Sequence, residues 1–268
     1  MVTIRPTDVR NGAGAHRNMM GRPIWFIGVP SGRLDLLSLK ALALLRNCQS
    51  CFYASSLISE DVLSLCSSAT LVKDTLNDSV EDVLYMMMVS ASTGGITVKL
   101  YSGSLSVYSG MQELAFHMRS LGMHFAVVPS VGALDVAFAQ LGYEFFTPWN
   151  RAIVITKVTK RPTNNRKLLC LESLANATPL LVLFLSVRLM SYVGTALLAS
   201  YGSNCPTLCV YRSAWNEETY LLTRLSKLST DVRALSLNRT AMLIIGRSLL
   251  SFKVWGTAVS SGRAIAPC

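Results

Sequence analysis

Short apolar segments that alternate with amphipathic helical segments limit the fold of this chain more than any other feature. The pattern begins with PIWFIGV at residues 23–29 and a helical segment at 35–47 that opens on an aspartate N-cap. It continues with CFYAS at 51–55, a helical segment with a capping box that starts at Ser79, and GITVKL at 95–100. Such alternation favours a largely parallel sheet with right-handed crossovers. We therefore expect an α/β fold.

The alternation continues on both sides of a polar segment that contains a proline, FFTPWN at 145–150. Beyond this segment lie the apolar strands RAIVITKV, PLLVLFLSV, TLCVYR and TAMLIIG. We expect two tandem α/β domains, an N-terminal one at 23–146 and a C-terminal one at 147–250. Residues 1–22 are expected to be a disordered tail, and residues 251–268 a second tail.

The apolar content of the chain, 51% of its residues, raises the question of a membrane span. Its densest apolar runs, at 179–187 and 241–245, are far shorter than the roughly 18 to 20 residues that cross a bilayer. They are typical of strands buried on both faces of a parallel sheet. The N-terminal stretch lacks the apolar region of a signal peptide, and the seven irregularly spaced cysteines fit free thiols. We expect a cytoplasmic protein with no membrane partner.

The formal net charge of +10 indicates an acidic partner. The cations are scattered except at 157–167, and no nucleic-acid-binding signature accompanies them. A polycarboxylate small molecule would fit the same charge balance. The three histidines, His16, His117 and His124, are too dispersed to predict a metal site. Motifs of serine hydrolases, P-loop proteins and zinc proteases are missing, and GVPSGR at 28–33 fits a dinucleotide fingerprint only loosely. No catalytic side chain is predicted.

A loop of serine and glycine, within YSGSLSVYSGMQEL at 101–114, follows the apolar segment at 95–100. Such a loop is either a plain connection in an α/β sheet or a ligand-cradling loop at the carboxyl end of a parallel strand. The loop alone does not decide between the two interpretations.

Seven segments in chain order carry a resemblance to a known family. They are FIGVPSGRLDLLSLKALALL, CFYASSLIS, KLYSGSLSVYSGMQEL, VVPSVGAL, VLFLSV, CVYRSAW and RTAMLIIGRSLL. The series resembles the tetrapyrrole (class III) S-adenosylmethionine-dependent methyltransferases, and within them it is most similar to the precorrin-4 C11-methyltransferases. The resemblance implies a parallel N-terminal sheet, a mixed C-terminal sheet and a homodimer, with S-adenosylmethionine in a cleft between the domains. It also implies methylation of C11 of precorrin-4, or of cobalt-precorrin-4, to give precorrin-5 in cobalamin synthesis.

Matching these segments residue by residue gives a donor-binding set, which the resemblance implies is held largely by main-chain groups. Its members are Ser31, Ser102, Gly103, Ser104, Val107, Tyr108, Gly132, Ala133, Leu185, Tyr211, Arg212, Ser213, Thr240 and Ala241. Lys157 and Arg161 are candidates for contacts with substrate carboxylates, although a solvated surface loop explains them equally well. Methyl transfer needs two reactants fixed at close distance and requires neither a nucleophilic side chain nor a metal.

Several positions depart from the family pattern. Pro30 and Ser130 replace glycines, Arg33 replaces an aspartate, and VYRSAW reverses the usual Ala-Ser order. In the loop at 102–109, Ser104, Leu105 and Ser109 replace aspartate, proline and glycine. The retained core pattern favours a working enzyme. The alternatives are a tetrapyrrole methylase that acts at another carbon and a degenerate, non-catalytic relative that binds polyanions.

Overall fold

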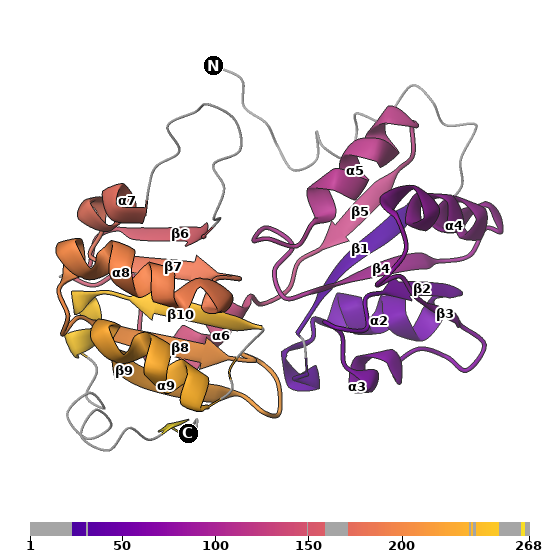
Figure 1. Cartoon of the computed structure of the whole chain (residues 1–268). Coiled ribbons are helices and arrows are strands. Elements are labelled where there is room, and N and C mark those ends of the chain that lie inside the picture. The colour runs from indigo at the N-terminus through magenta and orange to yellow at the C-terminus, as the bar shows by residue number, and fades with distance from the viewer. Residues whose placement is uncertain are drawn as a thin grey trace. The chain divides into compact units, whose positions relative to one another are not determined.

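The computed structural model describes residues 23–30, 32–148, 150–158, 171–235, 237, 240–251 and 264–265. The chain forms two compact units, one that ends at Gly132 and one that begins at Ala133, and each unit contains one sheet (Figure 1). Among the described residues, none of the helices has the length and apolar character needed to span a bilayer. The expected tail at 1–22 lies outside the described residues.

The first unit is built on a five-stranded sheet in the order β3-β2-β4-β1-β5. The strands are β1 (Ile24–Val29), β2 (Ser50–Tyr53), β3 (Leu71–Asp74), β4 (Thr97–Ser102) and β5 (Phe125–Val128). All four strand pairings are parallel. The prediction of a parallel sheet from the apolar segments is therefore confirmed.

Helices cover both faces of this sheet. They are α2 (Leu39–Asn47), α3 (Glu60–Leu63), α4 (Val80–Ser92) and α5 (Met111–Ser120), with the short 3-10 turn η1 (Leu34–Leu36) before α2. Ile24 and Phe26 of β1 pack with α4 and α5, whereas Ile27 and Val29 pack with α2 and α3. Because β1 is buried on both faces, its sequence reads as a continuous apolar run.

The beginnings of two helices test the predicted caps. Ser79 caps α4 by accepting a hydrogen bond from the Asp82 amide at 3.1 Å, which confirms the capping box. The predicted Asp35 cap is wrong. Helix α2 begins later, at Leu39, and its cap is Ser38, while the Asp35 carboxylate pairs with Arg33 at 2.6 Å.

The second unit contains a mixed six-stranded sheet in the order β11-β9-β8-β10-β7-β6. The strands are β6 (Ile153–Lys157), β7 (Leu180–Phe184), β8 (Pro206–Tyr211), β9 (Thr219–Arg224), β10 (Ala241–Ile245) and β11 (Ala264–Ile265). Strands β6 and β7 are parallel, and the other pairs are antiparallel. This confirms the mixed C-terminal sheet that the family resemblance implies.

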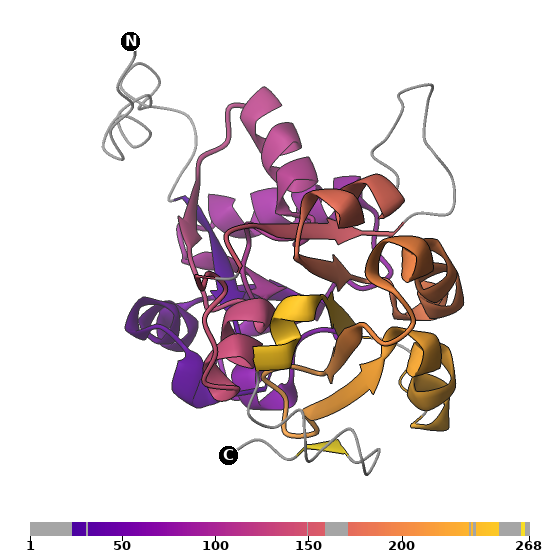
Figure 2. The same ribbon diagram turned by 90° about the vertical axis from the view of Figure 1, so that its left-hand side faces the viewer.

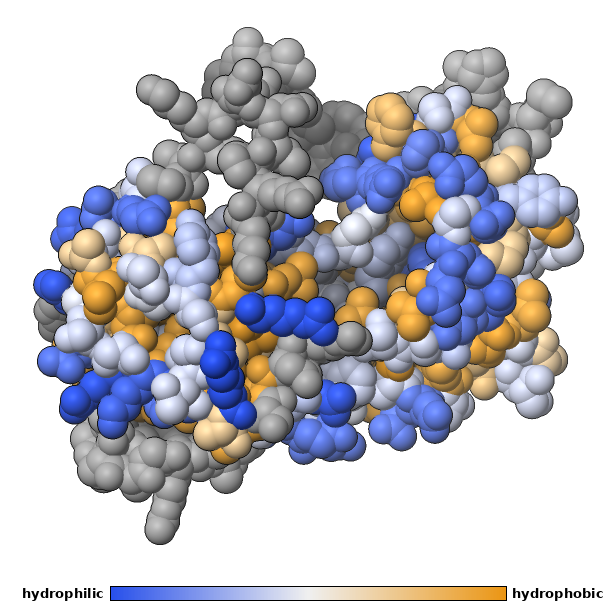
Figure 3. All heavy atoms as spheres, in the orientation of Figure 1, coloured by the Kyte–Doolittle hydropathy of each residue, from blue (hydrophilic) through white to orange (hydrophobic). Residues whose placement is uncertain are grey.

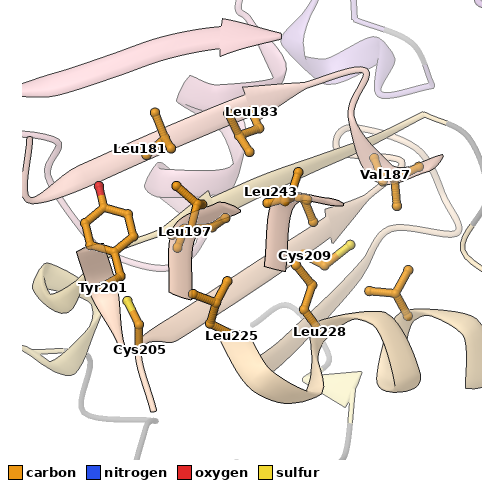
Figure 4. Close-up of a cluster of buried hydrophobic side chains, with 14 of the residues drawn as sticks. Leu181, Leu183, Val187, Leu197, Tyr201, Cys205, Cys209, Leu225, Leu228 and Leu243 are labelled. Carbon is orange, nitrogen blue, oxygen red and sulfur yellow. The ribbon is translucent and has the colours of Figure 1, made fainter. Parts of the chain in front are cut away.

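Two hydrophobic clusters lie on the two faces of this sheet. Figure 2 shows the helices that cover these faces. One face carries α7 (Leu171–Ala177), α8 (Met190–Tyr201) and α9 (Leu228–Ala234), with the 3-10 turns η2 (Val187–Leu189) and η3 (Leu225–Lys227). Figure 4 shows Leu197 and Tyr201 of α8 beside Leu181 of β7 in this core. The opposite face carries α6 (Ala133–Gln140) and the 3-10 helix η4 (Arg247–Ser251).

Helix α6 packs with the second sheet, so the structure divides the chain earlier than the boundary expected after residue 146. Phe138 of α6 lies in the same core as Leu180 and Val182 of β7. The Tyr220 hydroxyl of β9 also donates a hydrogen bond to Gln140 at 2.6 Å. The segment at 145–150, expected to be a linker, instead forms a turn of the second unit that is closed by hydrogen bonds between Thr147 and Asn150.

Within the expected C-terminal tail at 251–268, the structure describes Ser251 and two later residues. Ala264 and Ile265 form β11, which pairs with Leu221 and Tyr220 of β9 and forms the outer strand of the sheet. The apolar alternation was too short to signal a strand there, because two residues carry no recognisable period.

Candidate functional site

In the first unit, the loops that follow β4 and β5 converge on the end of β1. The Gly103 amide, at φ +67°, donates a hydrogen bond to the Val29 carbonyl at 2.7 Å. A Cβ atom added to Gly28 would lie 2.7 Å from the Gly103 oxygen and 2.7 Å from the Ser130 Cβ. Side-chain atoms do not approach this closely, so only glycine fits at position 28. The Ser102–Ser104 loop and the Ser130 loop therefore meet at one point.

Gly28 was not among the residues predicted for the site, although it lies where these loops meet. Its signal was weak, because a single glycine inside an apolar strand indicates either a bulge or a close approach of another backbone. Leu105, which stands where the family has proline, also approaches this point, with its Cδ1 atom 2.6 Å from the same added Cβ. The substituted loop is thus tightly packed against β1.

A buried hydroxyl without a partner lies at the same convergence. The Ser130 Oγ atom is buried and makes no hydrogen bond among the described residues. An unmade hydrogen bond at a buried polar atom costs about 1–3 kcal/mol. Pro30, which like Ser130 replaces a family glycine, is buried at the end of β1.

The loop between β4 and α5 is an ordered turn. The Ser109 hydroxyl donates to the Leu105 carbonyl at 2.7 Å and accepts from the Met111 amide at 3.1 Å. Tyr108 has φ +53° and is 44% exposed, and Gly110, the N-cap of α5, has φ +77°. Helix α5 begins at Met111, so the exposed Tyr108 belongs to the turn that precedes it.

In the second unit, the predicted residues gather at one edge of the sheet. Tyr211 at the end of β8 pairs with Ala241 at the start of β10. The Arg212 amide donates to the Thr240 carbonyl at 2.9 Å. Leu185 follows β7, which is the other neighbour of β10. These elements come from distant parts of the sequence, and antiparallel pairing brings them together.

Lys157 belongs to the same edge. It is the last residue of β6 and is paired in register with Phe184, the residue before Leu185. Its side chain is exposed. Two predicted residues lie outside the described residues: Ser31, which follows β1, and Arg161, which follows β6.

Left-handed backbone conformations mark the predicted set. The described residues other than glycine that have positive φ are Tyr108, Leu185, Arg212, Ala214 and Thr240. Four of these five belong to the set, and Ala214 is the neighbour of Ser213. Such a conformation costs about 1–2 kcal/mol per residue in a chain of L-amino acids. Strained residues cluster at ligand-binding sites, where the surrounding structure holds them in place.

The side chain of Arg212 is held by aromatic rings and one carboxylate. Its guanidinium lies 5.5 Å from the Tyr211 ring centroid and 5.3 Å from that of Trp215. It also forms an ion pair with Glu217 at 3.4 Å. The cation thus contacts two aromatic rings and one carboxylate, while 38% of the Arg212 side chain remains exposed.

A buried lysine lies on β4, just before the Ser102–Ser104 loop. The Lys99 side chain is 8% exposed, and its Nζ atom donates to the Thr75 hydroxyl at 2.5 Å. Burial lowers the pKa of Lys99 from 10.5 to about 8. The Thr75 hydroxyl in turn donates to the Tyr53 carbonyl at 2.7 Å, so it both accepts from Lys99 and donates its own proton. The burial of Lys99 has no recognisable signal in the sequence, because a lysine inside a strand is usually exposed.

The chemistry that these residues offer is mainly that of the main chain. Among the described residues, no group of three or more His, Cys, Asp or Glu side chains could hold a metal ion. In the space-filling view, the most hydrophilic side chains are spread over the visible surface, with apolar side chains between them (Figure 3). The loops at the end of the first sheet and at the end of the second sheet therefore provide main-chain carbonyl and amide groups, several of them on residues with positive φ, and a few cations.

Comparison with known proteins identifies relatives across nearly the whole chain. The family model described as Tetrapyrrole (Corrin/Porphyrin) Methylases matches residues 23–229. A precorrin-4 C(11)-methyltransferase from Rhodococcus erythropolis is 29% identical over 227 residues, which cover 84% of this chain and 91% of that protein. The crystal structure of a cobalt precorrin-4 methyltransferase, a cobalamin biosynthetic enzyme, matches with a TM-score of 0.80 at 24% identity, over 85% of this chain and 95% of that one. A uroporphyrin-III C-methyltransferase from Thermus thermophilus, complexed with S-adenosylhomocysteine, matches with a TM-score of 0.69 at 20% identity, over 85% of this chain and 93% of that one.

Proposed function

Since the chain belongs to the tetrapyrrole (corrin/porphyrin) methylases, we propose that it methylates C11 of precorrin-4 or cobalt-precorrin-4 in cobalamin biosynthesis. The methyl donor is S-adenosylmethionine, and the product is precorrin-5 or its cobalt form. Relatives named for this reaction support the proposal, among them the Rhodococcus erythropolis protein. The observation that carries it is the coincidence of left-handed backbone with the donor-binding residues that the resemblance implies.

The residues at hand fit a donor of this kind. A Cβ on Gly28 would fill the point where the loops after β4 and β5 meet the end of β1. With glycine at this position, main-chain atoms can lie close to β1. The buried Ser130 hydroxyl makes no hydrogen bond among the described residues, which is typical of a site adapted to further contacts. The groups that would hold the donor are the main chains of Ser102–Ser104, Gly132–Ala133, Leu185, Tyr211–Ser213 and Thr240–Ala241.

The chemical contribution of this chain is positioning. When bound, S-adenosylmethionine supplies a sulfonium methyl group that a nucleophilic carbon can take by in-line displacement. The rigid loops fix the donor, and fixing two reactants at close distance can supply about 7–11 kcal/mol of the barrier. Arg33 stands in place of the family's aspartate and is paired with Asp35 at 2.6 Å, so the first loop carries no carboxylate of the family type.

The substrate proposal draws on charge. A net charge of +10 attracts a macrocycle with carboxylate side chains. Lys157 lies at the same sheet edge as Leu185 and would contact substrate carboxylates, with Arg161 as a second candidate. We also infer a homodimer from the family resemblance and a cytoplasmic location from the free cysteines.

Two measurements test the function. Calorimetric titration with S-adenosylhomocysteine should give saturable binding, and lack of binding at millimolar ligand would rule out the methylase proposal. Incubation with precorrin-4, with and without cobalt, and with methyl-labelled donor should place the label on C11. A label on another carbon would point to a different tetrapyrrole methylase. Salt-sensitive binding to DNA or RNA without affinity for S-adenosylhomocysteine would instead indicate a polyanion-binding relative.

A further inference from the structure

The turn between β8 and β9 combines two strained residues with a dense set of contacts. Arg212 has φ +50° and Ala214 has φ +65°. Neither is a glycine, so both conformations must be imposed by the surroundings. Within the turn, the Trp215 amide donates to the Arg212 carbonyl at 2.9 Å. The stacked Arg212 side chain adds a second fixed contact to the same turn.

Two hydrogen bonds connect this turn to other segments. The Arg212 amide donates to Thr240 before β10, as described above. The Ser213 hydroxyl donates to the carbonyl of Ala133 at 2.9 Å, across a separation of 80 residues. Ser213 is 9% exposed, so this bond is protected from competing water.

The Ser213 bond joins two parts of the proposed donor-binding set. Ala133 is the first residue of α6, and Gly132 precedes it. The other end of the bond belongs to the Tyr211–Ser213 segment. A site that binds through main-chain groups depends on the relative placement of its segments, because no flexible side chain can compensate for a shift.

The position of this hydroxyl is a departure of this chain from its family. The family resemblance gives Ala-Ser at this place, whereas the chain has Ser213 followed by Ala214. The reversal brings a hydroxyl to the residue that contacts α6 and leaves a left-handed alanine next to it. The strain at Ala214 is thus accompanied by a long-range contact that the chain gains at Ser213.

We propose that Ser213 is a positioning residue, whose hydroxyl holds the Gly132–Ala133 main chain in register with Tyr211–Ser213 for donor binding. The inference rests on the proposed function, since it concerns the same donor. It assigns no contact between the Ser213 hydroxyl and the donor. The hydroxyl acts through Ala133.

The test compares S213A with a control that loses a similar bond far from the set. Thr178 is buried, and its hydroxyl donates to the Ala152 carbonyl at 2.9 Å and accepts from the Leu180 amide at 3.2 Å. It precedes β7, whereas Leu185 of the set follows that strand. T178V therefore removes a buried tether at the opposite end of the strand, with nearly unchanged shape. S213T keeps the hydroxyl and serves as the conservative variant.

Calorimetry with S-adenosylhomocysteine should give an affinity about tenfold lower for S213A, because one buried hydrogen bond commonly has an effect of this size. T178V should lower the midpoint of urea unfolding at least as much as S213A does, without changing the affinity for S-adenosylhomocysteine. S213T should bind S-adenosylhomocysteine within about threefold of wild type. In turnover, S213A should raise KM for the donor more than it lowers kcat.

Each other outcome is decisive. If S213A binds like wild type, or if T178V loses as much affinity as S213A, Ser213 has only a structural role and the inference is wrong. A tenfold loss in S213T as well would overturn it, since the hydroxyl would then not be the cause. If the wild-type protein itself does not bind S-adenosylhomocysteine, the proposed function fails, which is distinct from these results.

Discussion

Replacing Lys99 with methionine should stabilise the protein at neutral pH. The lysine is 8% exposed, and its pKa is lowered from 10.5 to about 8. Each unit of pKa corresponds to about 1.36 kcal/mol, so keeping the buried amine charged costs about 3 kcal/mol of folding free energy. Methionine has a similar length and no charge. Thr75 keeps a partner after the change, because its hydroxyl donates to the Tyr53 carbonyl.

The pH dependence follows from the same values. Below about pH 8, Lys99 is protonated in both the folded and the unfolded protein, and the full cost applies. Between pH 8 and 10.5 the folded protein releases the proton while the unfolded protein retains it, so wild-type stability rises relative to K99M. Above pH 10.5 the amine is neutral in both states and the cost is gone. The advantage of K99M should therefore be largest at neutral pH and shrink through this range.

Because the chain has two units, the assay must report on the first one. Urea unfolding followed by hydrogen exchange in peptides of β1 and β4 meets this need. Lys40 of the same unit is exposed and its amine lies over the Trp25 ring, so K40M is the matched control and should change stability by less than about 1 kcal/mol. A K99M protein that is less stable than wild type at pH 7, or a difference that does not change with pH, would refute the reasoning.

Three further substitutions test the two sheet edges. G28A should reduce the affinity for S-adenosylhomocysteine at least about tenfold by calorimetry, because its Cβ would lie 2.7 Å from the Gly103 oxygen and the loops would have to move; unchanged affinity would contradict this. S130G should raise the free energy of unfolding by about 1 kcal/mol, since it removes a buried hydroxyl that has no partner among the described residues. A lower free energy of unfolding for S130G, measured by urea denaturation, would show that the hydroxyl makes a stabilising hydrogen bond. T240G should stabilise by about 1 kcal/mol, because a β-branched residue at φ +53° is strained. A lower unfolding midpoint for T240G would mean that the backbone conformation of Thr240 is not strained.

Local patterns predicted the elements of the fold well. The apolar run at 23–29 became β1, and the capping box at Ser79 begins α4. Both signals depend on residues close together in sequence, so a single chain is enough to read them. Asp35 failed as a cap because two sites compete there. Ser38 caps α2, so the helix begins later and is shorter than predicted, and the Asp35 carboxylate pairs with Arg33 instead.

Long-range contacts were beyond the reach of these patterns. Strand β9, with the sequence TYLLTR, was not predicted, because its apolar run covers only Tyr220–Leu222 and is flanked by threonines. The closeness of Gly28 to Ser130 depends on the register of β1 with β5. The burial of Lys99 likewise depends on how α4 covers the sheet. The donor-binding set itself came from family resemblance rather than from the residues' own chemistry.

Helix α6 carries a practical consequence for dissecting this protein. A recombinant fragment that started at residue 147 would lack Phe138 and would open the apolar face formed by Leu180, Val182 and Leu208 to water. Such a piece would be prone to self-association through that bare face. A fragment that starts at Ala133 brings its own cover, and it also retains the carbonyl that Ser213 holds. Where the chain is cut thus decides whether the C-terminal half can be expressed on its own.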